Sequence, residues 1–331
     1  MILTENGVDK VNELDVSSFT WRSINVYDSI VRWGVPIFVM ISGALFLGKE
    51  RPIKVLFSKH IGRILITFLA WSVFYTAWNN FNSGESHLFR ELIMSDLKGH
   101  YHMWFLYMIA CLYMVVPFLN LIVRHRKLTN YFIILAFLFV FAIPQCITII
   151  GIKSEYLSEN IQNVLSETHM YFVLGFTGYF VLGYVLHKTQ IGKKCETIIY
   201  IMGIGSLFFT VFVTMWISKR NQESSELFYN SMTVNILTTS IAIFVFAKQH
   251  MNKPLKSEKA MHVLSYISKC TFGVYLVHLL IINCLRRFVG ITNLSFNPII
   301  SVPILALIVF VCSMGISAIM NKIPFVKKWF V

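Results

Sequence analysis

Long apolar runs alternate with short polar segments along nearly the whole chain. Nine such runs are each about 16–22 residues long, and about 20 apolar residues are enough for an α-helix to cross the hydrocarbon core of a bilayer. We therefore predict an all-α fold, a polytopic membrane helical bundle of about nine transmembrane helices. The predicted spans are residues 30–47, 61–78, 103–121, 131–152, 170–186, 197–217, 232–247, 267–284 and 299–320.

The same pattern divides the chain into two parts. Residues 1–28 are polar and slightly acidic, and they lack the positively charged start and the apolar core of a signal peptide. The remainder, residues 29–331, has only short loops, so we assign it to one transmembrane domain. Composition agrees with this assignment, because only 14% of the residues are charged, whereas a soluble domain carries about 25%.

Positive charge is distributed unevenly among the loops. If consecutive loops lie on alternate sides of the membrane, one side carries seventeen Lys and Arg residues and the other side carries nine. The side with seventeen consists of the loops at 48–60, 122–130, 187–196 and 248–266 and of the tail 321–331. The positive-inside rule then places the C-terminus in the cytoplasm and the N-terminus outside. The net charge of +13 thus indicates contact with anionic lipid and not with nucleic acid. The six cysteines form no CxxC pair, so we expect neither a disulfide framework nor a metal site.

A basic turn joins the first two predicted spans and ends in Lys59, His60 and Arg63. On a helix, this spacing places the three side chains on one face at the membrane boundary. Cations beside an imidazole suit an anionic ligand, phosphates above all. Arg32, near the start of the first span, is a further candidate for substrate binding. The alternative for Arg32 and Arg63 is that each side chain snorkels to the membrane surface.

The third and eighth spans carry the candidate catalytic groups. His102, Trp104 and Tyr107 open the third span. They form either an aromatic belt or a mouth that faces a sugar or acyl group, where His102 moves a proton near neutral pH. Tyr275 and His278 lie three residues apart within the eighth span. A histidine there is costly unless it faces the bundle interior or a wet cavity; the alternative is a histidine satisfied by hydrogen bonds between helices.

Three blocks of sequence stand in a characteristic order. They are VPIFVMISGALFL at 35–47, followed by KHIGRILITFLAW at 59–71; HMWFLYMIACLYMVVPFL at 102–119; and SKCTFGVYLVHLLI at 268–281. Each block alone is a weak apolar signature. Together, in this order and with matching loop charge, they resemble the acyltransferase-3 family of polytopic membrane acyltransferases over most of the chain.

The resemblance implies a ten-span bundle that transfers an acyl group, often acetyl, from cytoplasmic acyl-CoA to a sugar of a cell-surface or exported glycan. Acyl-CoA is then a co-substrate, and no bound cofactor is expected. The Arg-x-x-Arg element of the family, which serves the CoA end, falls on His60 and Arg63, with Lys59 as a neighbouring cation. The catalytic histidine in the first span of the family, and the arginine before it, have no counterpart here. The first recognisable block corresponds to the second span of the family, so we expect a truncated or degenerate copy.

We therefore predict a membrane acyltransferase in the plasma membrane of a bacterium, with His102 or His278 as the base if the chain is active. Its expected partners are the lipid bilayer, acyl-CoA and a glycan or lipid-linked sugar. Two alternatives remain open. A transporter or flippase for a lipid-linked sugar or small anion would move its substrate without consuming acyl-CoA. A catalytically inactive membrane partner would instead co-purify with a full-length homologue.

Overall fold

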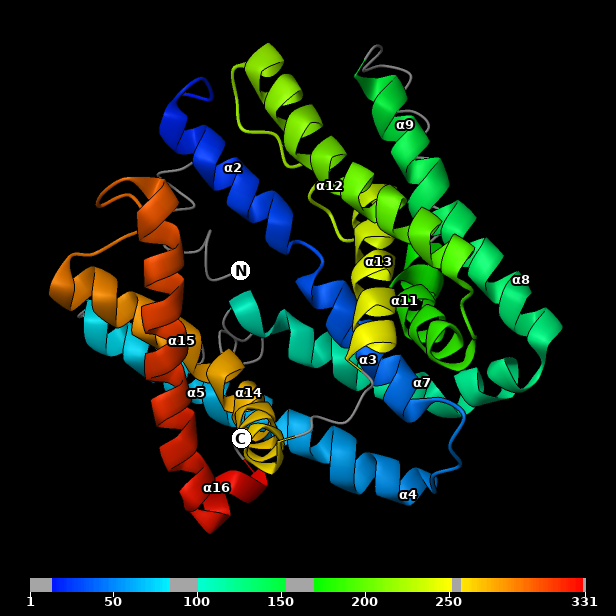
Figure 1. Ribbon diagram of the computed structural model, residues 1–331. Helices are drawn as coiled ribbons and strands as arrows, with labels where there is room; N and C mark the ends of the chain where they lie inside the picture. The colour runs from blue at the N-terminus through cyan, green and yellow to red at the C-terminus, as the bar shows by residue number, and fades with distance from the viewer. Residues whose placement is uncertain (1–13, 84–100, 153–169, 252–256, 330–331) are drawn as a thin grey trace.

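The computed structural model describes residues 14–83, 101–152, 170–251 and 257–329, and the regular elements in them are all helical (Figure 1). The first half contains α2 (Phe19–Val31), α3 (Gly34–Phe46), α4 (Ile53–Val55), the π-helical turn η1 (Leu56–Ile61), α5 (Gly62–Ser83), the short turn η2 (Tyr101–Met103), α7 (Trp104–Arg124), α8 (Arg126–Ala136), the π-helical turn η3 (Phe137–Ala142) and α9 (Ile143–Gly151). The second half contains α11 (Met170–Lys188), α12 (Lys193–Asn221), α13 (Val234–His250), α14 (Glu258–Cys284), the π-helical turn η4 (Leu285–Val289), α15 (Pro298–Lys322) and α16 (Pro324–Trp329).

The predicted membrane bundle is confirmed. Among the described residues, seven helical stretches are long and apolar enough to cross a membrane: Phe19–Phe46, Ile53–Trp78, Trp104–Arg124, Arg126–Gly151, Lys193–Asn221, Glu258–Val289 and Pro298–Lys322. The other two predicted spans coincide with α11 and α13, which have 19 and 17 residues. Several helices run past their predicted ends, because helical hydrogen bonding continues where the side chains turn polar.

The first spanning stretch begins earlier than the apolar pattern predicts. The side chain of Ser18 accepts a hydrogen bond from the backbone N–H of Trp21 at 3.1 Å and caps the start of α2. α2 then buries polar residues such as Asp28, which a search for apolar runs does not detect. We predicted that the polar segment 1–28 lies outside the transmembrane domain. From Phe19 onward this is wrong, because α2 packs in the bundle against α12 and α15.

The backbones of α3 and α11 approach each other closely. A Cβ atom added at Gly43 would lie 1.8 Å from the carbonyl oxygen of Phe180, and one added at Gly183 would lie 2.1 Å from that of Met40. Small residues permit such close contact between membrane helices. This contact lies in a core that joins α3, α7, α8, α11 and α13, while a second core joins α5, α7, α14 and α15.

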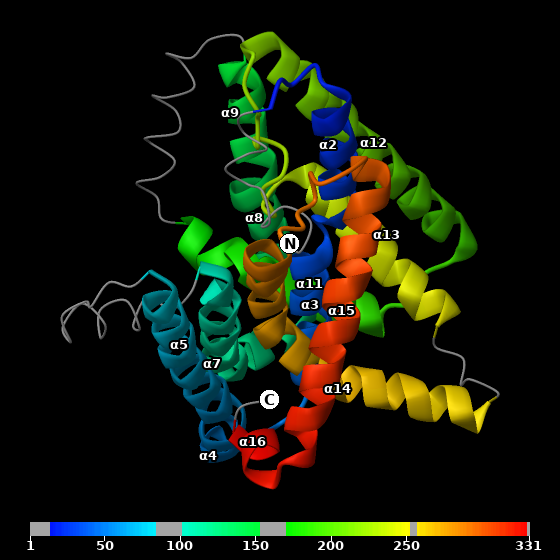
Figure 2. The ribbon, with the colours of Figure 1, turned by 90° about the vertical axis from the view of Figure 1, so that its left-hand side faces the viewer.

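The connections between the helices are divided between the two ends of the bundle. Figure 2 shows α4, the start of α14 and α16 at its lower end, and the start of α2 and the end of α12 at its upper end. Three of the segments rich in Lys and Arg, which are α4, the start of α14 and α16, therefore lie at the lower end. Which end faces the cytoplasm stays a prediction from the positive-inside rule.

Candidate functional site

Two buried histidines meet between η2 and α14. The rings of His102 and His278 lie edge to face, with 5.5 Å between their centroids, and the two residues are 0% and 3% exposed. η2 holds His102 just before the start of α7, and α14 carries His278 on its buried face. The structure thus brings together the two histidines that the sequence singles out in separate spans.

Two tyrosines surround this histidine pair. The ring centroid of Tyr275 lies 5.8 Å from that of His102 and 6.0 Å from that of His278, and its hydroxyl donates to the backbone carbonyl of His102 at 2.7 Å. The ring of Tyr75 on α5 lies 5.1 Å from that of His102, and its hydroxyl donates to the carbonyl of Leu276 at 2.7 Å. The sequence did not point to Tyr75, because an aromatic residue inside an apolar span resembles ordinary packing.

A backbone contact determines which nitrogen of His278 is basic. Its Nδ1 atom lies 2.6 Å from the carbonyl oxygen of Tyr275. Since a carbonyl oxygen only accepts hydrogen bonds, Nδ1 carries the hydrogen, and the lone pair of the neutral ring is on Nε2. An imidazole oriented in this way is suited to remove a proton from a substrate hydroxyl.

The two predicted mouth residues lie on the first turn of α7. Trp104 is 40% exposed and Tyr107 is 37% exposed. The ring of Trp104 lies 5.9 Å from that of Phe176 on α11, and the ring of Tyr107 lies 4.2 Å from that of Phe68 on α5. Each ring is thus supported on one side and accessible on another, as contact with a substrate requires. Their role in substrate binding stays a prediction.

Arg32 is part of a polar cluster. The alternative considered from the sequence was a side chain that snorkels to the membrane surface. It forms an ion pair with Asp28, and its guanidinium lies 4.2 Å from the ring centroid of Tyr229 in the segment after α12. Burial, with the negative charge of Asp28, raises the pKa of Tyr229, so its hydroxyl stays protonated and bonds with Asn25. The four-residue spacing of Asp28 and Arg32 is the sequence signal that indicates this pair.

The predicted basic patch lies at the π-helical turn η1 and the start of α5. His60 points into the bundle, where its ring lies 5.0 Å from that of Phe46 and 6.4 Å from that of Tyr113. Lys59 and Arg63 are exposed. The three side chains therefore do not share one environment: the imidazole is half-buried and the two cations face outward.

Arg51 adds a further positive charge to this patch. Its guanidinium lies 4.2 Å from the ring centroid of Phe46, the same ring that His60 contacts. The charges of Arg51, Lys59 and Arg63 all act on the His60 imidazole. This concentration of positive charge attracts anions. The sequence placed Arg51 in the basic turn, but only the folded loop places it beside His60.

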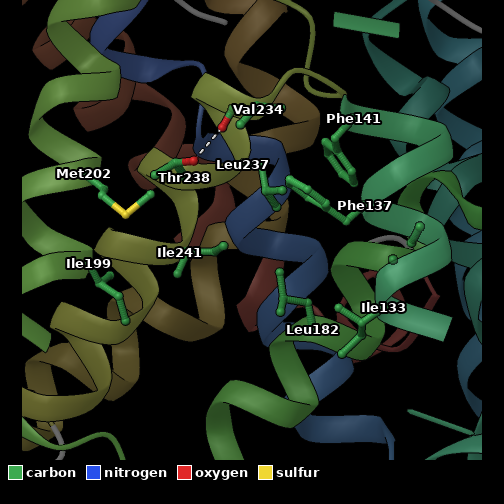
Figure 3. A pocket seen from close by; sticks show the side chains of 12 residues that line it. Ile133, Phe137, Phe141, Leu182, Ile199, Met202, Val234, Leu237, Thr238 and Ile241 are labelled. Carbon is green, nitrogen blue, oxygen red and sulfur yellow. Dashed lines mark hydrogen bonds between the residues drawn. The ribbon is translucent and has the colours of Figure 1, made fainter. Parts of the chain in front are cut away.

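A pocket of about 310 Å³ lies between α8, η3, α11, α12 and α13 (Figure 3). Its lining is almost entirely hydrocarbon, with Phe137, Leu182 and Met202 among the side chains that face it. The hydroxyl of Thr238 donates to the carbonyl of Val234 at 2.7 Å within its own helix. The pocket therefore offers little to a sugar or a phosphate, and the polar candidates above lie elsewhere.

Comparison with known families supports the same class of protein. Residues 9–319 match the family described as Acyltransferase domain, Acyl_transf_3. No curated protein and no solved structure matches the chain. The matched region contains the histidine pair, the Arg32 cluster and the basic patch, and it covers far more than half of the sequence. The chain therefore belongs to this family of membrane acyltransferases.

Proposed function

We propose that this protein transfers an acetyl group, or another acyl group, from cytoplasmic acyl-CoA to a sugar hydroxyl of a cell-surface or exported glycan. The observation that carries the proposal is the contact between His102 and His278 in the interior of a membrane acyltransferase. A buried imidazole with a fixed tautomer supplies the base that this chemistry needs.

The proposed reaction is a single acyl transfer. The sugar hydroxyl oxygen attacks the thioester carbonyl carbon, and Nε2 of His278 takes the hydroxyl proton. The carbon–sulfur bond then breaks, and the departing CoA thiolate takes the proton from the imidazolium. The rings of His102 and His278 lie edge to face, and Tyr275 links the two histidines through its backbone and its hydroxyl. These contacts hold the base in place during proton transfer.

The basic patch is the proposed binding site for the phosphates of acyl-CoA. Lys59 and Arg63 are exposed and supply positive charge that a phosphate reaches from the aqueous phase. His60 and Arg51 lie behind them and add to the positive field. This assignment requires that the basic end of the bundle faces the cytoplasm of a bacterial cell.

The acceptor side is proposed to lie near the start of α7. Trp104 and Tyr107 present partly exposed rings, and aromatic rings stack well on the apolar faces of sugars. Arg32 is the proposed contact for polar groups of the acceptor. A glycan and a lipid-linked sugar both fit this description.

Transfer of a radiolabelled acetyl group tests the proposal. Membranes that contain the full chain are incubated with radiolabelled acetyl-CoA, and label is measured in the glycan fraction together with the release of free CoA. His278→Ala and His102→Ala are expected to reduce both signals by about 10²–10⁴-fold, the usual contribution of a general base. The matched control is His262→Ala on the exposed first part of the same helix, which should retain full transfer. Equal activity in all four proteins would refute the role of the pair.

One structural observation favours a second candidate function. The ion pair of Asp28 and Arg32 belongs to a stretch long enough to span the membrane, and charged residues in such stretches often line the path of a transported substrate. A transporter or flippase would carry a labelled sugar into vesicles without release of CoA. An inactive partner protein would do neither, and the same assay separates the three.

A further inference from the structure

The first twelve residues of α14, Glu258–Lys269, differ from the rest of that helix. All twelve are exposed, whereas the helix from Cys270 onward has a buried face that includes Cys270, Leu276 and Val277. Figure 2 shows this first part of α14, in yellow, running sideways from the bundle and roughly across the direction of α15. It lies at the same end of the bundle as α4 and α16.

The length of the helix agrees with a division between Lys269 and Cys270 into an exposed part and a membrane-spanning part. The stretch Glu258–Val289 has 32 residues, which corresponds to about 48 Å at about 1.5 Å per residue. The hydrocarbon core of a bilayer is only about 30 Å thick. The excess of about 18 Å corresponds to about twelve residues, which is the length of the exposed segment. The part of the stretch from Cys270 to Val289 is therefore long enough to cross the membrane.

The exposed segment is amphipathic. Val263, Leu264 and Ile267 lie on one face at helical spacing, together with Ala260, and they are 58%, 55% and 36% exposed. The opposite face carries Glu258, His262, Ser265 and Lys269. An apolar face left open to water at the edge of a membrane domain needs a cover.

We propose that Glu258–Lys269 is an interfacial helix that lies in the headgroup region of the bilayer, with its apolar face toward the acyl chains. The occupant of the apolar face is the bilayer itself, because the same helix continues without interruption into the membrane-spanning bundle. Its sideways direction keeps it in the plane of the surface. Lys269 on the other face and Lys259 on the flank of the helix can reach lipid phosphates. This arrangement is typical of interfacial amphipathic helices.

Nitroxide scanning of the full chain in vesicles of phosphatidylethanolamine and phosphatidylglycerol tests the proposal. The six native cysteines are replaced, and single cysteines are introduced for labelling at Val263, Leu264 and Ile267 on the apolar face. His262 and Ser265 report on the polar face. Accessibility to oxygen and to a water-soluble nickel chelate gives the depth of each label. Leu307, which is exposed on α15, is the control for the bilayer core, and Glu223 in the segment after α12 is the control for water.

We expect the three apolar positions to lie about 5–10 Å below the headgroup level, shallower than Leu307, and the two polar positions to remain accessible to the nickel chelate. Equal exposure of all five positions to the chelate would overturn the proposal, because the segment would then project into water. Protection of all five from both reagents would also overturn it, because a protein would then cover the helix. Spectral broadening that disappears on dilution with unlabelled chain would identify that protein as a second copy.

Discussion

The hydroxyl of Tyr275 donates a hydrogen bond to the backbone carbonyl of His102 at 2.7 Å. This bond ties α14 to η2 at the place where the two histidine rings meet. The backbone carbonyl of Tyr275 also accepts a hydrogen bond from the Nδ1–H group of His278. One residue therefore orients the base and holds the segment that carries its neighbour, which makes it the natural point at which to test the site.

Replacement Tyr275→Phe removes the hydroxyl and keeps the ring. The lost hydrogen bond should cost about 1 kcal/mol of stability, and acyl transfer should fall further than this loss of folded protein explains, because η2 is released. The matched control is Tyr27→Phe, which removes a hydroxyl that donates to the carbonyl of Ile299 at 2.8 Å. Thermal unfolding in detergent and acetyl transfer are measured for both variants. Loss of transfer in proportion to stability in both proteins would contradict a role for Tyr275 in the site.

Replacement Arg63→Ala tests the proposed phosphate contact. A hydrogen bond to a charged group contributes about 1.5–3 kcal/mol, so the apparent KM for acyl-CoA should rise by about tenfold or more while the KM for the acceptor stays unchanged. Arg124→Ala is the matched control, since this arginine lies at the same end and pairs with Glu50. An equal rise of both KM values, or a rise in the control variant alone, would count against the assignment.

Replacement Arg32→Ala leaves Asp28 buried without its ion-pair partner. Removal of one member of a buried pair costs about 3–5 kcal/mol, and the partial exposure of Arg32 places the expected loss at the low end of that range. The double variant Asp28→Asn, Arg32→Gln removes both charges and should be more stable than the single variant. The midpoint of thermal unfolding in detergent checks the order. A double variant less stable than Arg32→Ala would show that the cluster does not act as an ion pair.

Replacement Gly43→Ala places a methyl group 1.8 Å from the carbonyl oxygen of Phe180. Two backbones cannot rearrange as readily as a side chain, so α3 and α11 should separate and the yield of folded protein should fall sharply. Gly205→Ala on α12 is the control, because its added methyl meets nothing within 4 Å and alanine favours the helix by about 1 kcal/mol. Equal yields of the two variants would contradict the close contact.

Local patterns were enough for the overall architecture. An apolar run long enough to cross a bilayer predicts a membrane-spanning helix, and each predicted span coincides with helical structure. The beginning of the first helix was mispredicted, because α2 buries Asn25, Asp28 and Ser29 and a polar residue buried against protein looks, in the sequence, like a residue in water. The different surroundings of Lys59, which is exposed, and His60, whose ring contacts Phe46, were likewise not predicted.

The sequence by itself determined that the chain forms a helical membrane bundle, which loops are basic and which histidines are expensive to place in a membrane, because these properties depend on residue type and short-range order. Only the tertiary structure decided that His102 and His278 share one site, that Tyr75 lies against them, and that the guanidinium of Arg32 lies over the ring of Tyr229. Such contacts join segments far apart in the chain. Their geometry depends on how neighbouring helices pack, and no local pattern encodes it.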